Sequence, residues 1–246
     1  MLKRTEGIVL RTIPFGEADL IVTYLTPDFG IIKLFAKSPR KIKSRFGSSL
    51  EPLTHSRIAF WGKEDTALPR LTQSDILHPF QSIRDSLACF LKVSQLIELT
   101  LSFMPERDAN NKVYALLFNT LIEIEATGFA GKNLLAHHFR IKLLDLVGFA
   151  PKLDVCGRCG SKGDTFYISQ GSLLCVLCAR GMDSPIRLSP AVLKLYSDLL
   201  TWDTTKIQRI KPSDRLISEL SGILTMHITY VLSRPLKTAS FVHSLH

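Results

Sequence analysis

Four of the five cysteines form two pairs whose spacing suits a metal site. Cys156 and Cys159 are separated by two residues, as are Cys175 and Cys178, and 15 residues lie between the pairs. Two residues between thiolates allow both sulfurs of one turn to face the same ion, and two such turns complete a tetrahedron around Zn²⁺. Four thiolates leave no ligand position for water. We therefore predict one structural zinc ion per chain, not a catalytic one.

Redox and disulfide chemistry explain these cysteines less well. A thioredoxin-type site needs one C-x-x-C at the start of a helix in a βαβ unit, and two disulfides need an oxidising compartment. The N-terminus lacks the apolar run of a secretory signal, so we expect the protein in the reducing cytoplasm. The fifth cysteine, Cys89, lies in an apolar helical pattern, where we expect a buried core thiol.

The segment that carries the cysteines reads as a small β-hairpin. Phe166–Ile168 and Leu173–Leu174 have strand character, and Gln170-Gly171 is a turn between them. A hairpin between two cysteine pairs is the layout of a zinc ribbon. We place this zinc-ribbon-like insert at about residues 152–187.

A second group of residues has the chemistry to bind a polyanion. No acidic residue occurs between Phe29 and Leu50, a stretch rich in Lys and Arg. If Ile31–Lys37 is a strand, alternation puts Lys33, Phe35 and Lys37 on one face, where cations flank an aromatic ring that could stack on a base. A basic loop follows, which we expect to contact phosphate rather than base edges. The predicted DNA-binding residues are Lys33, Phe35, Lys37, Arg40, Lys41, Lys43 and Arg45.

Two alternatives remain open for this basic stretch. The loop could be an ordinary solvated surface loop, and Phe35 could pack in the core instead of stacking on a base. The binding interpretation is favoured because the run contains no acidic residue and flanks a candidate OB strand. The whole chain also carries a formal net charge of +9. An excess of this sign suits nucleic acid or anionic lipid.

No segment has the length and composition of a membrane span. The apolar stretch Leu220–Ser233 has 14 residues without a formal charge. A bilayer requires about 20 predominantly apolar residues, so this stretch reads as a buried helix. We therefore expect no membrane association.

Two types of periodicity divide the chain near residue 80. Five short, β-branched runs precede it, which predicts a five-stranded barrel in residues 1–79, with an OB-fold favoured over an SH3-like barrel. Helical spacing dominates residues 80–246, with a continuous helix expected from Ile83 to Leu101. The expected fold is therefore α+β multidomain, with an OB-fold barrel followed by a helical domain that carries the zinc insert. The predicted strands are Ile8–Thr12, Leu20–Leu25, Ile31–Lys37, Leu53–Phe60 and Thr66–Leu71.

Nothing in the sequence indicates an enzyme. G-x-S-x-G and H-E-x-x-H motifs are absent, and His137 and His138 point about 100° apart on a helix, so they do not form a two-histidine site. Two rival functions remain: a zinc-ribbon RNA-binding or translation-associated module, and a metal-dependent nuclease. Competition between single-stranded DNA and RNA would distinguish an RNA-binding module, which prefers structured RNA, from a DNA-binding protein. A nuclease would need an open metal site with carboxylate or histidine ligands, which the sequence does not supply near the cysteines.

The order of four segments resembles the RecO family across almost the whole chain. The most specific segment joins a helix, a Gly-x-x-Pro exit and a zinc knuckle in fixed order. One departure is Ser38-Pro39, which stands where the family usually has a glycine or other small residues before its basic pair. The segments are Gly7–Thr26 with Gly30, Ser38–Ser44, Phe139–Gly160 and Arg234–Phe241.

The resemblance implies a non-enzymatic protein associated with the bacterial nucleoid. RecO-like proteins bind single- and double-stranded DNA, anneal complementary strands coated by single-strand-binding protein (SSB), and act with RecR to load RecA. It also implies that the helical domain receives the C-terminal tail of SSB. Phe139 with Arg140 and Lys142 is one of several groups that could provide an apolar pocket with a cationic rim.

Overall fold

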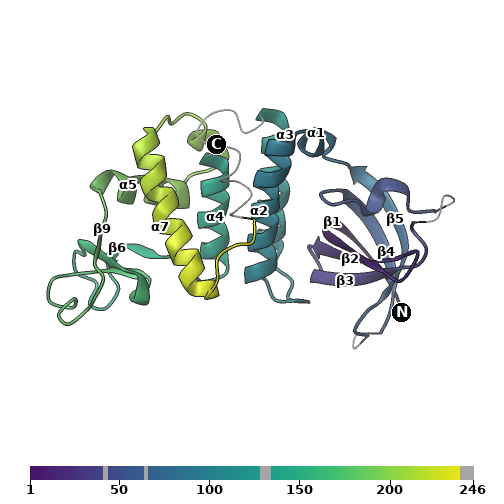
Figure 1. Ribbon diagram of the computed structural model, residues 1–246, viewed down its shortest axis with the longest axis horizontal. Helices are drawn as coiled ribbons and strands as arrows, with labels where there is room; N and C mark the ends of the chain where they lie inside the picture. The colour runs from purple at the N-terminus through teal and green to yellow at the C-terminus, as the bar shows by residue number, and fades with distance from the viewer. Residues whose placement is uncertain (41–43, 64–65, 128–133, 239–246) are drawn as a thin grey trace. The chain divides into compact units, whose positions relative to one another are not determined.

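The computed structural model describes residues 1–40, 44–63, 66–127 and 134–238 (Figure 1). The chain forms two compact units, residues 1–93 with 100–128, and residues 94–99 with 129–246. The domain boundary at residue 80 stays a prediction. No helix in the described ranges is long and apolar enough to cross a membrane.

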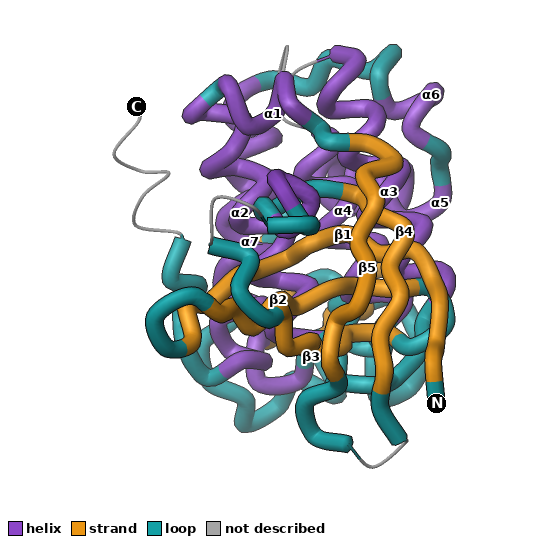
Figure 2. The backbone as a smooth tube through the Cα atoms, turned by 90° about the vertical axis from the view of Figure 1, so that its right-hand side faces the viewer, coloured by secondary structure: helices purple, strands orange, loops and turns teal. Residues whose placement is uncertain are grey.

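The first unit contains a closed five-stranded barrel (Figure 2). The strand order is β1-β2-β3-β5-β4, and β1 closes the ring by pairing antiparallel with β4. β3 and β5 are parallel. This arrangement confirms the predicted OB-like fold. The strands are β1 (Leu2–Phe15), β2 (Asp19–Thr26), β3 (Gly30–Ala36), β4 (His55–Trp61) and β5 (Arg70–His78).

The fifth strand is shifted from its predicted position at Thr66–Leu71. It begins at Arg70 and continues through a polar stretch to His78. Ser74 and Asp75 pair with Ile58 and Arg57 of β4, so backbone hydrogen bonding, not apolar composition, extends the strand.

Alternation along the strands fills the barrel with apolar side chains. Val22, Tyr24 and Leu34 are fully buried, and Phe46 and Leu50 from the β3–β4 connection add to the same core. The connection contains a short 3₁₀ helix, η1 (Gly47–Leu50).

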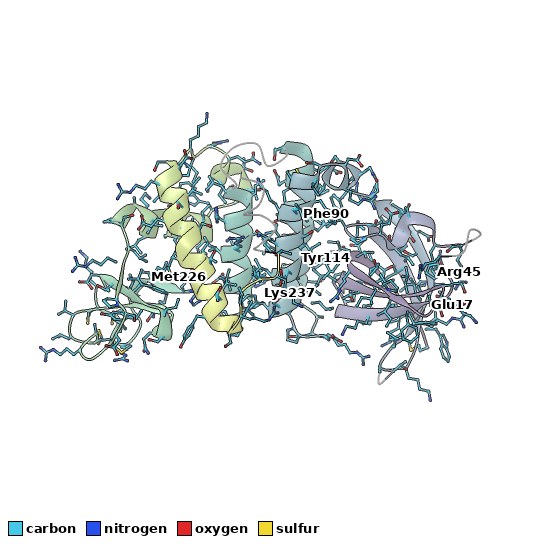
Figure 3. The ribbon with its side chains drawn as sticks, in the orientation of Figure 1. Glu17, Arg45, Phe90, Tyr114, Met226 and Lys237 are labelled. Atoms are coloured by element: carbon cyan, nitrogen blue, oxygen red, sulfur yellow. The ribbon has the colours of Figure 1, made fainter. Side chains whose placement is uncertain are left out.

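Helices α1 (Gln81–Asp85) and α3 (Asn111–Thr127) complete the first unit. Tyr114 points from α3 toward the barrel (Figure 3), and its hydroxyl lies 3.0 Å from His55 Nε2. The same hydroxyl donates to a Glu6 carboxylate oxygen at 3.3 Å. These contacts attach α3 to β1 and β4.

The expected continuous helix from Ile83 to Leu101 is broken. Ser86 has an extended backbone and separates α1 from α2 (Leu87–Phe103), because its hydroxyl accepts a hydrogen bond from the Cys89 N–H and caps the second helix. The prediction of a buried thiol at Cys89 was also wrong, since this residue is only partly buried.

The second unit combines helices with a small four-stranded sheet. Ser189 caps α5 by accepting the Val192 N–H, and Pro190 occupies the first turn, as the sequence predicted. The sheet has the order β6-β8-β7-β9, and a short 3₁₀ helix, η2 (Ile168–Gln170), lies between β7 and β8 in the chain. The elements are α4 (Leu134–Leu146), β6 (Lys152–Cys156), β7 (Thr165–Tyr167), β8 (Ser172–Leu174), β9 (Ile186–Arg187), α5 (Pro190–Thr201), α6 (Thr204–Ile207) and α7 (Asp214–Leu232).

Candidate metal site and nucleic-acid interface

The structure brings the four paired cysteines into one cluster. The sulfurs of Cys156, Cys159, Cys175 and Cys178 all lie within 4.8 Å of one another. All four are free thiols, and the Cys159 and Cys175 sulfurs are 3.7 Å apart. That separation is far beyond a disulfide bond of about 2.05 Å. It agrees with the spacing of about 3.8 Å that a tetrahedron with Zn–S distances of about 2.3 Å requires.

Tight backbone turns hold the two cysteine pairs in place. The Gly160 N–H donates to the Cys156 carbonyl at 2.9 Å, and Gly160 has a φ of +75°, which favours glycine. The Ala179 N–H donates to the Cys175 carbonyl at 3.0 Å in the second turn. Arg158 then donates from Nη1 to the Cys178 carbonyl at 2.9 Å and connects the two turns.

The electrostatics of the cluster favour a bound cation. Burial raises the pKa of Cys156, but hydrogen bonds from the backbone of Cys175, Cys159 and Arg158 outweigh it and lower that pKa to about 6. Hydrogen bonding with Cys159 and Cys175, together with burial, raises the pKa of Cys178 to about 12. One thiolate therefore forms readily, whereas four together need a positive ion to offset their repulsion.

The predicted strand face on β3 is present, and it extends over β1 and β2. Lys33 and Lys37 are exposed and Phe35 is partly buried, whereas Ile32, Leu34 and Ala36 point into the core. Ile21 of β2 pairs with Phe35 on one side and with Ile13 of β1 on the other. The three strands thus present one continuous outer surface. We call it the outer face and define it by Arg11, Ile13, Phe15, Ile21, Lys33, Phe35 and Lys37.

Phe15 is a residue of the outer face that the sequence reasoning missed. Its side chain is 51% exposed, and its ring meets that of Phe35 edge-to-face, with centroids 5.9 Å apart. Phe35 is therefore outside the barrel core. Extending β1 beyond Thr12 by its alternation would have placed Phe15 on the same face as Ile13.

The start of the basic loop is attached to the β1–β2 turn. Ser38 has a φ of +55°, a conformation that favours glycine, and its N–H donates to an Asp19 carboxylate oxygen at 2.6 Å. The Arg40 N–H donates to the Ala18 carbonyl at 3.3 Å. Serine at position 38 therefore adopts a backbone conformation that usually favours glycine.

The remaining predicted cations differ in their surroundings. Arg40 and Arg45 are exposed. The Arg45 guanidinium lies 4.9 Å from the centre of the Phe46 ring. Lys33 forms an ion pair with Glu106, which offsets part of its charge. Lys41 and Lys43 lie outside the described residues.

The example of an SSB-tail site in the third predicted helix does not match its surroundings in α4. Phe139 is fully buried, so its ring belongs to the core of the second unit. Arg140 donates from Nη2 to the Gln95 side-chain oxygen at 2.8 Å. These two side chains therefore do not form an open apolar pocket with a cationic rim.

Two family models match the chain. One, described as "Recombination protein O N terminal", matches residues 1–80, and the other, "Recombination protein O C terminal", matches residues 88–240. Together they span the barrel, helices α3 to α7, nearly all of α2 and the cysteine cluster.

Curated relatives are similar over nearly their full length. A DNA repair protein RecO from Thermodesulfovibrio yellowstonii is 43% identical over 234 residues, covering 93% of this chain and 92% of the relative. Proteins of the same name from Dehalococcoides mccartyi and Streptomyces coelicolor are 33% and 31% identical, each over 98% of this chain and over 95% and 98% of their own lengths. The chain therefore belongs to the RecO family of DNA repair proteins, which are recombination mediators and not enzymes.

Proposed function

We propose that this protein binds single- and double-stranded DNA through the outer face and the basic loop, and anneals complementary strands. The observation that carries the proposal is the ring contact between Phe15, which is 51% exposed, and the partly buried Phe35, beside the exposed Lys37 that follows β3. Strands of an OB barrel commonly bind oligonucleotides in this way, with aromatic rings stacking on bases and cations following the backbone.

Annealing needs no nucleotide hydrolysis under this proposal. Two single strands repel each other through their phosphates, and a cationic surface reduces that repulsion when both strands bind near it. The net charge of +9 supplies the required excess of positive charge. The family supports the wider role, which is to act with RecR in the bacterial cytoplasm and help load RecA on SSB-coated DNA.

We also propose one structural Zn²⁺ ion at Cys156, Cys159, Cys175 and Cys178. The support is the convergence of four free sulfurs within 4.8 Å. The ion would fix the insert, because a segment with three-residue strands buries little apolar surface of its own. The helical unit remains our proposed receptor for the acidic SSB tail.

Salt dependence tests the proposed DNA interface. Lys37→Gln and Arg40→Gln should each weaken binding to unrelated single-stranded sequences by a similar factor. Each should also reduce the slope of log K against log salt by about 0.7, the value expected for one lost phosphate contact. Arg57→Gln is the matched control, because Arg57 is exposed on β4 outside the outer face.

If both variants bind DNA with the affinity and salt slope of the wild-type protein, the basic loop is an ordinary solvated loop that makes no phosphate contact. A structured RNA competitor added to the same titration tests the RNA-binding alternative. Displacement of DNA by lower concentrations of RNA than of unlabelled single-stranded DNA would contradict the proposed preference.

A further inference from the structure

A cavity of about 200 Å³ opens beside the seam where β3 meets β5. The two strands pair only at Phe35 and Arg70, and Ile31 near the start of β3 pairs with Glu106 instead. Side chains of Ile32, Phe60 and Pro69 line the cavity between these contacts. The cavity therefore lies wholly within the first unit.

The wall of this cavity is positively charged. Lys3, Lys33, Lys63 and Arg107 line it, together with one carboxylate, Asp28. Glu106 pairs with Lys33 at the rim. Among the described residues that line or border the cavity, four cations and two carboxylates therefore leave an excess of two positive charges.

The arginine in this wall is held by the backbone around it. Arg107 has a φ of +64°, which is uncommon for a residue other than glycine. Its N–H donates to the Ile31 carbonyl at 2.9 Å, and its Nη2 donates to the Thr66 and Ala67 carbonyls at 2.5 and 3.1 Å. A left-handed backbone conformation at a residue other than glycine persists only where the surrounding structure maintains it. Such conformations are concentrated at functional sites. The guanidinium thus links the segment after α2 to the β4–β5 hairpin.

One side of the cavity is aromatic. The Phe29 ring meets Phe60 edge-to-face, with centroids 5.4 Å apart, and the Lys3 ammonium lies 5.2 Å from the centre of the Phe29 ring. A ligand that carries both an anionic group and a flat or apolar part suits such a lining.

We propose that this cavity binds a phosphomonoester, namely the terminal phosphate of a DNA strand with the attached nucleoside against Phe29. A diester in the middle of a strand carries one negative charge, whereas a monoester carries about 1.5 to 2 at pH 7. The excess of two positive charges matches the monoester better. The ligand is DNA only if the proposed function holds. The cavity shares Lys33 with the outer face, but Phe15 and Phe35 do not line it.

Two ligands carry a phosphomonoester attached to a nucleoside: the end of a DNA strand and a free deoxynucleoside monophosphate. The test uses the full chain and one single-stranded oligonucleotide in three forms: 5′-phosphorylated, 3′-phosphorylated and without a terminal phosphate. We expect one or both phosphorylated forms to bind about three- to tenfold more tightly at low salt. A free deoxynucleoside monophosphate, added as competitor, should remove this preference, and the nucleoside without phosphate should not.

Lys3 and its neighbour provide a matched pair of variants. Lys3 lines the cavity, whereas Arg4 is exposed on the opposite side of β1. Lys3→Gln should abolish the preference for a terminal phosphate, and Arg4→Gln should retain it although it loses the same charge. Lys63→Gln on the β4–β5 hairpin should act like Lys3→Gln and guards against a local folding defect in β1.

The outcomes separate this inference from the proposed function. Equal binding of all three oligonucleotides overturns the inference while leaving DNA binding intact. A preference that survives in both Lys3→Gln and Lys63→Gln also overturns it, because the phosphate then binds elsewhere. Absence of any DNA binding overturns the proposed function itself. Displacement of the phosphorylated strand by an acidic peptide, but not by the monophosphate, would identify the cavity as a peptide site and contradict the proposal.

Discussion

Cys156, Cys159, Cys175 and Cys178 show how far residue types and spacing determine local chemistry. Their spacing along the chain predicted that they would meet, and their sulfurs do lie within 4.8 Å of one another. The cysteine cluster could be predicted from the sequence because both cysteine pairs lie in short turns, each closed by a local backbone hydrogen bond.

Replacement of one ligand tests the metal site. In Cys175→Ser we expect bound zinc to be lost and the insert to unfold locally, because a hydroxyl does not replace a thiolate ligand and metal binding is coupled to folding. Metal analysis and thermal unfolding of the purified protein measure both effects. Cys89→Ser is the control and should keep one zinc ion per chain, since Cys89 lies outside the cluster. A wild-type protein without zinc would contradict the site.

Two buried histidines predict how stability depends on pH. Burial lowers the pKa of His137 to about 3, with a further contribution from Arg140, and lowers that of His138 to about 4, with a further contribution from Lys142. The unfolded chain therefore binds protons at these sites below pH of about 6.5, while the folded chain stays neutral there. The free energy of unfolding should fall as the pH drops from about 6.5 towards 4.

The variant His138→Gln should show a shallower decrease over the same range. The full effect of one histidine with this shift is on the order of 3 kcal/mol near pH 4. Urea unfolding of wild-type and variant protein at several pH values measures it. Parallel pH profiles would show that His138 titrates similarly in the folded and unfolded states.

At the scale of elements, sequence patterns predicted the type of most segments but not all their ends. Alternation and turn residues predicted the five strands, and the Ser189-Pro190 pair marked the start of α5. Residues 72–78 of β5 and the break at Ser86 were missed, because each depends on pairing or capping that composition does not reveal. Phe15 was missed for a different reason: the predicted strand ended at Thr12, whereas β1 continues to Phe15, and only its contact with Phe35 depends on another strand.

Alanine substitutions at Gly30 and Gly16 distinguish the cost of backbone strain from the cost of a steric clash in the first unit. Gly30 has a φ of +60°, and an added Cβ would lie 2.1 Å from the Asp108 carbonyl oxygen. Gly16 has a similar φ of +63° with no atom within 4 Å of an added Cβ. Gly16→Ala should therefore cost about 1 kcal/mol in stability from strain alone, and Gly30→Ala clearly more. Equal losses in denaturant unfolding would mean that the segment around Asp108 moves away freely.

At the scale of the whole molecule, the family and the charge agree on a role in DNA transactions. The formal charge of +9 was visible from composition, whereas the distribution of cations between the outer face and the cavity required the fold. Lys3 and Arg107 are 104 positions apart in the sequence and gave no joint signal, yet they line one cavity.

Annealing of complementary DNA strands coated with SSB is the most direct test of the central claim that the outer face acts on DNA. The wild-type protein should anneal them without nucleotide hydrolysis and without nuclease products. The double variant Phe15→Leu with Phe35→Leu should lose most of this activity, because each base that stacks on an aromatic ring contributes about 1–3 kcal/mol. Tyr230→Leu, which removes an aromatic side chain that is 52% exposed on α7, should anneal like wild type. Full annealing by a correctly folded double variant would contradict the claim.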